Sequence, residues 1–80
     1  MLVSAYDFLK NLKESVPQHA WIELNEGDET IGEFYINEEI DEGWKEYELM
    51  EIRRMRLRGV PVYMLEVKKE DKNDGKKERI

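Results

Sequence analysis

The sequence predicts an α+β domain in which one N-terminal helix packs on a four-stranded antiparallel sheet. The apolar residues of the first segment recur at helical spacing, whereas from Ala20 to Val67 most of them recur at every second position. Glycine-containing turns separate the alternating segments, which is typical of strands joined by hairpins. Because a chain of 80 residues has room for one hydrophobic core, we expect residues 1–69 to form a single small domain.

The helix is expected to begin after Ser4 and to end before Pro17. The Ser4 hydroxyl can accept a hydrogen bond from a first-turn amide, and Asp7 complements the positive end of the helix. The apolar residues that share one helical face are Ala5, Phe8, Leu9, Leu12 and Val16. Pro17 cannot continue a helix, because it lacks an N–H group and its ring clashes with the preceding turn.

Two strands are expected over 20–25 and 30–36, joined by a glycine-containing turn. In these strands large apolar side chains occupy both alternating sets, and the set that faces away from the helix contains Trp21, Ile31 and Tyr35. One helix covers one face of a sheet, so this second set is expected to stay uncovered in a monomer.

Residues 37–46 show no strand alternation and are expected to form a short helical or irregular excursion between the second and third strands. The segment over 47–58 is harder to assign, because its composition favours a helix while its apolar spacing fits neither period. We interpret it as a bulged strand, since a hairpin near Gly59 would join it to the clear strand over 60–67. A helix over 47–58 stays open as the alternative.

Composition argues against several classes of function. The chain has no cysteine and one histidine, His19, which excludes disulfides and argues against a zinc site within one chain. A set of nucleophile, base and oxyanion-hole candidates is missing, so we expect no enzymatic activity and no cofactor. Because the sequence contains neither a long apolar stretch nor a secretory pattern, we expect a cytoplasmic protein away from membranes. Residues 70–80 are charged and poor in apolar residues, so we expect a disordered tail.

The charges are sorted along the chain. The formal net charge is -6, and from Glu23 to Glu51 there are twelve acids and one base. Arginines then dominate from Arg53 to Arg58. The candidate charged surface comprises Glu38, Glu39, Asp41, Glu42, Arg54, Arg56 and Arg58. The acids do not have the spacing of an EF-hand calcium loop, so we expect no metal.

The sorted charges are interpreted as a pairing scheme within the sheet. Acids on neighbouring strands could form cross-strand ion pairs with the arginines before a phosphate reached them. The acids expected to do so are Glu23, Glu33 and Glu66.

The apolar residues on the face away from the helix form a candidate protein interface, consisting of Trp21, Ile31, Tyr35, Val62 and Met64. Tryptophan, tyrosine and methionine are enriched at interface centres, and a small domain gains stability when it buries such a surface against a second chain. We therefore expect a non-enzymatic protein-binding module that forms a homo-oligomer such as a homodimer. One alternative is an acidic protein that mimics nucleic acid and occupies a nucleic-acid-binding protein. Direct nucleic-acid binding through the Arg53 to Arg58 stripe is the third hypothesis, and the net negative charge disfavours it.

The order of these segments resembles that of short uncharacterised proteins encoded in bacterial prophages and mobile elements. The resemblance is carried by "YDFLKNLK", "WIEL", "IGEFYI", "EEIDEGW", "YELMEI" and "VPVYMLEV", which lie between Tyr6 and Val67. It implies a small phage or accessory protein and supplies no active-site residue.

Overall fold

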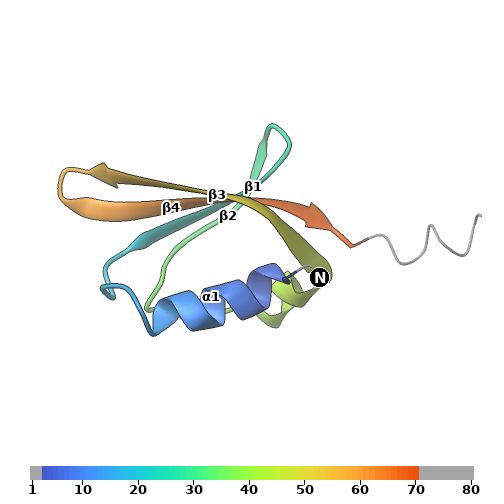
Figure 1. Cartoon of the computed structure of the whole chain (residues 1–80), viewed down its shortest axis with the longest axis horizontal. Coiled ribbons are helices and arrows are strands. Elements are labelled where there is room, and N and C mark those ends of the chain that lie inside the picture. Colours follow the sequence, from blue (N-terminus) through green and yellow to red (C-terminus); the bar gives the residue numbers. More distant parts are fainter. Residues whose placement is uncertain (1–2, 71–80) are drawn as a thin grey trace, which may run out of the picture.

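The computed structural model describes residues 3–70. Its elements are α1 (Ala5–Lys13), β1 (Trp21–Glu26), β2 (Glu29–Tyr35), the 3-10 helix η1 (Glu42–Glu46), β3 (Tyr47–Leu57) and β4 (Val60–Lys69). One N-terminal α-helix lies against a four-stranded sheet, which is the α+β architecture that the sequence predicts (Figure 1). The predicted disorder of residues 71–80 lies outside the described residues. Glu70 is described, and its backbone N–H donates to the Glu46 carbonyl over 2.6 Å.

The sheet is mixed, so the prediction of a purely antiparallel sheet is wrong. The strand order is β2-β1-β4-β3, and the two central strands, β1 and β4, run parallel to each other. Each hairpin is antiparallel, as its short turn requires, but a hairpin does not determine which of its strands will lie beside the other hairpin. The crossover over 36–46 carries the chain from β2 at one edge to β3 at the other, so that β4 returns beside β1 (Figure 1).

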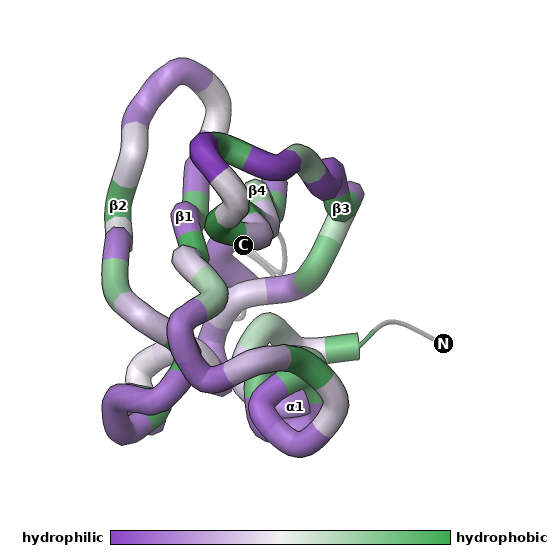
Figure 2. Tube along the Cα trace, turned by 90° about the vertical axis from the view of Figure 1, so that its left-hand side faces the viewer, coloured by the Kyte–Doolittle hydropathy of each residue, from purple (hydrophilic) through white to green (hydrophobic). Residues whose placement is uncertain are grey.

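The core lies between one face of the sheet, α1 and the crossover. Figure 2 shows α1 end-on, lying against one side of the sheet. The buried apolar residues are Ala5, Leu9, Ala20, Ile22, Leu24, Ile36, Ile40, Leu65 and Val67. Two of them come from the crossover, which therefore acts with α1 as the covering layer.

Gly32 of β2 lets the crossover approach the sheet closely. A Cβ atom at this position would lie 2.6 Å from Cζ2 of Trp44, which is packed against the core. The absence of a side chain therefore makes room for the indole ring. Lys13 ties α1 to the crossover as well, because its Nζ donates to the Glu38 carbonyl over 2.9 Å.

α1 begins where the sequence predicts and ends before Pro17. The Ser4 hydroxyl accepts a hydrogen bond from the Asp7 N–H over 3.0 Å, as expected of an N-cap. The helix ends at Lys13, and the Gln18 side chain donates to the Lys13 carbonyl over 2.9 Å, which satisfies a carbonyl of the last turn. Within residues 3–70, no helix is long and apolar enough to cross a membrane.

β3 is the bulged strand that the sequence predicts, and a helix over these residues is excluded. Leu49 lies opposite Val67 while Glu51 lies opposite Glu66, which leaves Met50 as the extra residue. The hairpin turn follows at residues 58–59, where both residues have positive φ angles of 53° and 83°. Such a two-residue turn matches the twist of the strands that it joins.

Candidate functional site

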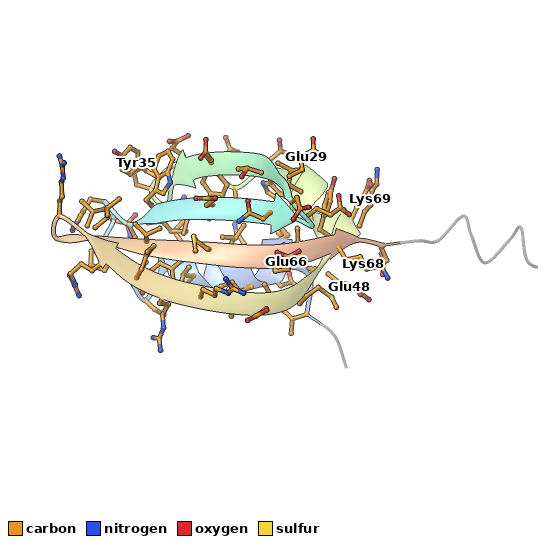
Figure 3. All side chains as sticks on the ribbon, turned by 90° about the horizontal axis from the view of Figure 1, so that it is seen from above. Glu29, Tyr35, Glu48, Glu66, Lys68 and Lys69 are labelled. Carbon is orange, nitrogen blue, oxygen red and sulfur yellow. The ribbon has the colours of Figure 1, made fainter. Side chains whose placement is uncertain are left out.

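The sheet face turned away from α1, which we call the open face, is sorted by chemistry. The strand register places one residue of each strand side by side in rows across the sheet. One row is apolar, and Leu57 and Val60 extend it to the end of the β3–β4 hairpin. The apolar patch therefore consists of Tyr35, Trp21, Val62, Met55, Leu57 and Val60. Figure 3 looks onto the open face and shows Tyr35 at one end of β2.

The apolar patch has a buried centre and exposed margins. Val62 is 6% exposed although it does not belong to the core cluster, and its neighbours in the row are Trp21 and Met55. The rings of Trp21 and Tyr35 meet edge to face, with centroids 4.9 Å apart. Tyr35 is 47% exposed and Leu57 is 60% exposed. A shallow groove of about 350 Å³ is lined by Trp21, Tyr35, Leu57, Arg58, Val60 and Val62.

The next two rows of the open face are rich in carboxylates. From β2 to β3 the second row is Glu33, Glu23, Met64 and Arg53, and the third is Thr30, Asn25, Glu66 and Glu51. Two pairs of carboxylates are therefore direct cross-strand neighbours, an arrangement that charge repulsion disfavours. The open face thus has one apolar end and one acidic end.

Local contacts offset part of this repulsion. The Glu66 carboxylate accepts a hydrogen bond from the Gly27 N–H over 2.9 Å, which ties β4 to the β1–β2 turn. Arg53 Nε lies 3.5 Å from a carboxylate oxygen of Glu51 on the same strand. Both contacts lie at the acidic end, so Glu51 and Glu66 have structural partners there.

The structure places four of the five predicted interface residues on the open face. Trp21, Tyr35 and Val62 belong to the apolar patch, whereas Met64 lies in the neighbouring row. The prediction for Ile31 is wrong, because this residue packs against the core.

A bulge explains the error at Ile31. Leu24 lies opposite Gly32 and Asn25 lies opposite Thr30, so Ile31 is an extra residue in β2. Strict alternation through the strand cannot anticipate such a shift.

Sequence reasoning missed Met55, Leu57 and Val60 as members of the patch. The signal was present, because residues at equal distances from a two-residue turn lie opposite each other. Counting outward from the turn at 58–59 pairs Leu57 with Val60 and Met55 with Val62, which was already assigned to this face.

The acids of the crossover make local contacts. The Glu38 carboxylate accepts a hydrogen bond from the Tyr35 N–H over 3.1 Å, and the Asp41 carboxylate accepts one from the Gly43 N–H over 2.7 Å. Glu42 forms an ion pair with Lys45 at 3.5 Å, and Glu39 is exposed. In the described part of the chain, no group of three or more acidic or histidine side chains is arranged to hold a metal ion. Three of the four predicted surface acids thus stabilise turns or the start of η1.

The arginines do not form one stripe, because the strand register divides them. Arg53 lies on the open face, whereas Arg54 lies opposite Tyr63 and Arg56 opposite Pro61, on the face of α1. Arg58 lies in the turn and not in the strand. The side chains of Arg54 and Arg56 line a second shallow depression of about 370 Å³ together with Met55, Pro61 and Tyr63.

The predicted pairing of these arginines with acids of the neighbouring strands is wrong. Arg53 with Glu51 is the single arginine ion pair within residues 3–70. β3 is an edge strand with β4 as its neighbour, so the acids of β1 and β2 are one and two strands further away. Glu66 of β4 lies on the open face and therefore points away from Arg54 and Arg56.

The chemistry of the apolar patch suits contact with another molecule. Aromatic and aliphatic side chains in one row, without a carboxylate among them, provide contact area and a gain from desolvation. Comparison of the chain with models of protein families, with curated proteins and with solved structures finds no match. The patch is therefore the candidate functional site on its geometry alone.

Proposed function

We propose that this chain is a non-enzymatic protein-binding module that self-associates through the apolar patch. The observation that carries the proposal is the row of Tyr35, Trp21, Val62 and Met55, which crosses all four strands and is covered by no element within residues 3–70. A core of this size supplies little stability alone, so burying the row against a second copy stabilises both chains. An accessory role in a prophage or mobile element, which the sequence resemblance favours, belongs to the same proposal.

The sorting of the open face favours one arrangement of the two copies. In an isologous dimer both copies use the same surface around a two-fold axis. The favoured two-fold axis lies in the interface, runs perpendicular to the strands and passes through the apolar patch. Rotation about this axis places the patch of one copy on the patch of the other, and the acidic ends of the two copies then lie on opposite sides of the axis. Complete overlap of the two faces would place the Glu23 and Glu33 carboxylates of both copies in one interface, where charge repulsion opposes association.

Three variants that each replace an exposed apolar residue by glutamate test the proposal. Tyr35→Glu and Leu57→Glu place a carboxylate at two margins of the patch, whereas Met50→Glu places one at the β3 bulge outside it. In sedimentation equilibrium the wild type is expected to show a mass that rises with concentration. Both patch variants should remain monomeric because an unpaired charge would be buried in the interface, and Met50→Glu should behave as the wild type.

A wild type that stays monomeric over the whole concentration range would show that self-association is wrong. If Met50→Glu made the protein monomeric as the two patch variants do, the added charge would act at any position and not through the apolar patch. Circular dichroism of each variant separates these outcomes from unfolding, and an unfolded Tyr35→Glu would place Tyr35 in the core of the monomer.

An acidic mimic of nucleic acid is the second candidate function. It is favoured by the paired carboxylates of the open face, Glu23 with Glu33 and Glu51 with Glu66. Such a mimic should bind a basic nucleic-acid-binding protein with an affinity that falls steeply as salt rises. Association through the apolar patch should change little with salt, so one titration in sodium chloride distinguishes the two functions.

A further inference from the structure

The outer edge of β3 is closed at its start and open beyond the bulge. At the start, the Leu49 N–H donates to the Val3 carbonyl over 2.9 Å, and Ser4 forms a bridge with Glu48. Beyond Met50, no strand within residues 3–70 pairs with this side of β3, and residues 50–57 are all exposed.

The turn determines which backbone groups face outward. A two-residue turn at 58–59 makes Leu57 and Val60 a hydrogen-bonded pair, and such pairs recur at every second residue of an antiparallel ladder. The odd-numbered residues from 51 to 57 therefore bond to β4. The N–H and C=O groups of Ile52, Arg54 and Arg56 point away from the sheet, where an additional strand could pair with them.

The side chains beside this edge specify the sequence of such a strand. Arg54 and Arg56 lie on the face of α1, whereas Met55 and Leu57 lie on the open face. Side chains of an added strand alternate between the same two faces. Acidic residues at every second position would meet the two arginines, and apolar residues between them would meet the methionine and the leucine.

A second copy of this chain is a poor occupant of the edge. Antiparallel pairing of β3 with β3 about Arg54 would place Arg54 of one copy directly opposite Arg54 of the other, and like charges in that position repel each other. The edge of β2 is acidic, but its Tyr35 N–H is occupied by the Glu38 carboxylate and its alternation is interrupted at Ile31. The charges and the free backbone groups therefore favour a strand from another protein.

We propose that the edge of β3 from Ile52 to Arg56 binds an extended segment of another protein in which acidic and apolar residues alternate. Backbone hydrogen bonds would hold the segment in register, and its carboxylates would pair with Arg54 and Arg56. This site uses the edge of the sheet and is separate from self-association through the apolar patch.

Binding of short synthetic peptides tests the proposal. The probe alternates glutamate and valine. One control peptide replaces glutamate by lysine, and another keeps the glutamates but is N-methylated at every residue, so that it cannot donate backbone hydrogen bonds. The glutamate peptide alone is expected to bind and to slow hydrogen exchange of the Ile52, Arg54 and Arg56 amides by at least about tenfold. Amides of residues 51, 53 and 55 already bond to β4 and should change little.

Two sets of variants locate the charge contribution. The double variant Arg54→Gln, Arg56→Gln should weaken peptide binding roughly three- to tenfold, because two cross-strand ion pairs are lost. Arg53→Gln is the matched control, since Arg53 lies on the other face and pairs with Glu51, and it should weaken binding by less than about twofold. The measurements are repeated in Tyr35→Glu, so that a failure of self-association is distinguished from a failure of strand addition.

Several results would overturn the proposal. Equal binding of the lysine peptide would show that the contact does not depend on charge. Equal binding of the N-methylated peptide would show that it does not use the backbone groups of the free edge. Tighter binding of a single-stranded oligonucleotide, with displacement of the peptide, would assign the arginines to nucleic acid. If the edge amides already exchanged slowly without peptide, and exchanged more slowly still as the protein concentration rose, a second copy would occupy the edge.

Discussion

The two faces of the sheet are formed by the same strands but differ in what covers them. On the face of α1, the helix and the crossover bury Ile22, Leu24, Leu65 and Val67 almost completely. On the open face the large apolar side chains gather at one end, and Val62 is the one strand residue of that face within 3–70 that is buried. Alternation within each strand creates two faces, and the connections between strands then determine which face becomes the core.

The largest expected effect comes from breaking the covered face. Leu9→Ala should lower the free energy of unfolding by about 2–5 kcal/mol, because it leaves a cavity between α1 and the sheet. A core of this size supplies roughly 3–5 kcal/mol, so the variant should lose a large share of its stability and unfold at a much lower urea concentration. The matched open-face variant Leu57→Ala should cost at most about 0.5 kcal/mol in the monomer. Urea denaturation followed by circular dichroism, at a concentration where the protein is monomeric, compares them, and similar losses would contradict the distinction between the faces.

A smaller effect is expected where the crossover meets the covered face. Gly32→Ala should cost about 1–3 kcal/mol, since the new methyl group would lie 2.6 Å from the Trp44 ring and the indole must move. A double-mutant cycle with Trp44→Leu identifies the cause, because the cost of Gly32→Ala should fall once the indole is removed. An unchanged cost in the Trp44→Leu background would place the strain in the β2 backbone instead.

The helix and the strands β1, β2 and β4 could be predicted from the sequence because their signals are local, whereas β3 was interpreted as a strand only because a hairpin near Gly59 would join it to β4. Ser4 caps a helix, alternation marks β1 and β4, and glycine marks the turns. The parallel pairing of β1 with β4 depends on the path of the crossover, which buries Ile36 and Ile40 but has no period of its own. Periodicity alone gives no information about such a long-range arrangement.

The candidate site was predicted only where its residues lie in regular stretches of strand. Trp21, Tyr35 and Val62 lie in regular stretches where alternation gives the correct face. Ile31 and Met50 are extra residues at bulges, where strict alternation cannot be continued from one side of the bulge to the other. The pairing of Arg54 and Arg56 was predicted wrongly because it required the strand order, which places β3 at an edge.

The smallest expected effect concerns the acidic end of the open face and has the opposite sign. Glu33 lies directly opposite Glu23, so Glu33→Gln should remove a repulsion and raise the free energy of unfolding by about 0.2–1 kcal/mol. Because salt screens exposed charges, the gain should shrink as sodium chloride approaches 1 M, where the screening length is about 3 Å. Glu39→Gln is the control, since it also removes one exposed carboxylate but lies in the crossover outside the paired strands, and it should change stability less. Urea denaturation at low and high salt measures both, and a destabilised Glu33→Gln would mean that Glu33 has a favourable partner on this face.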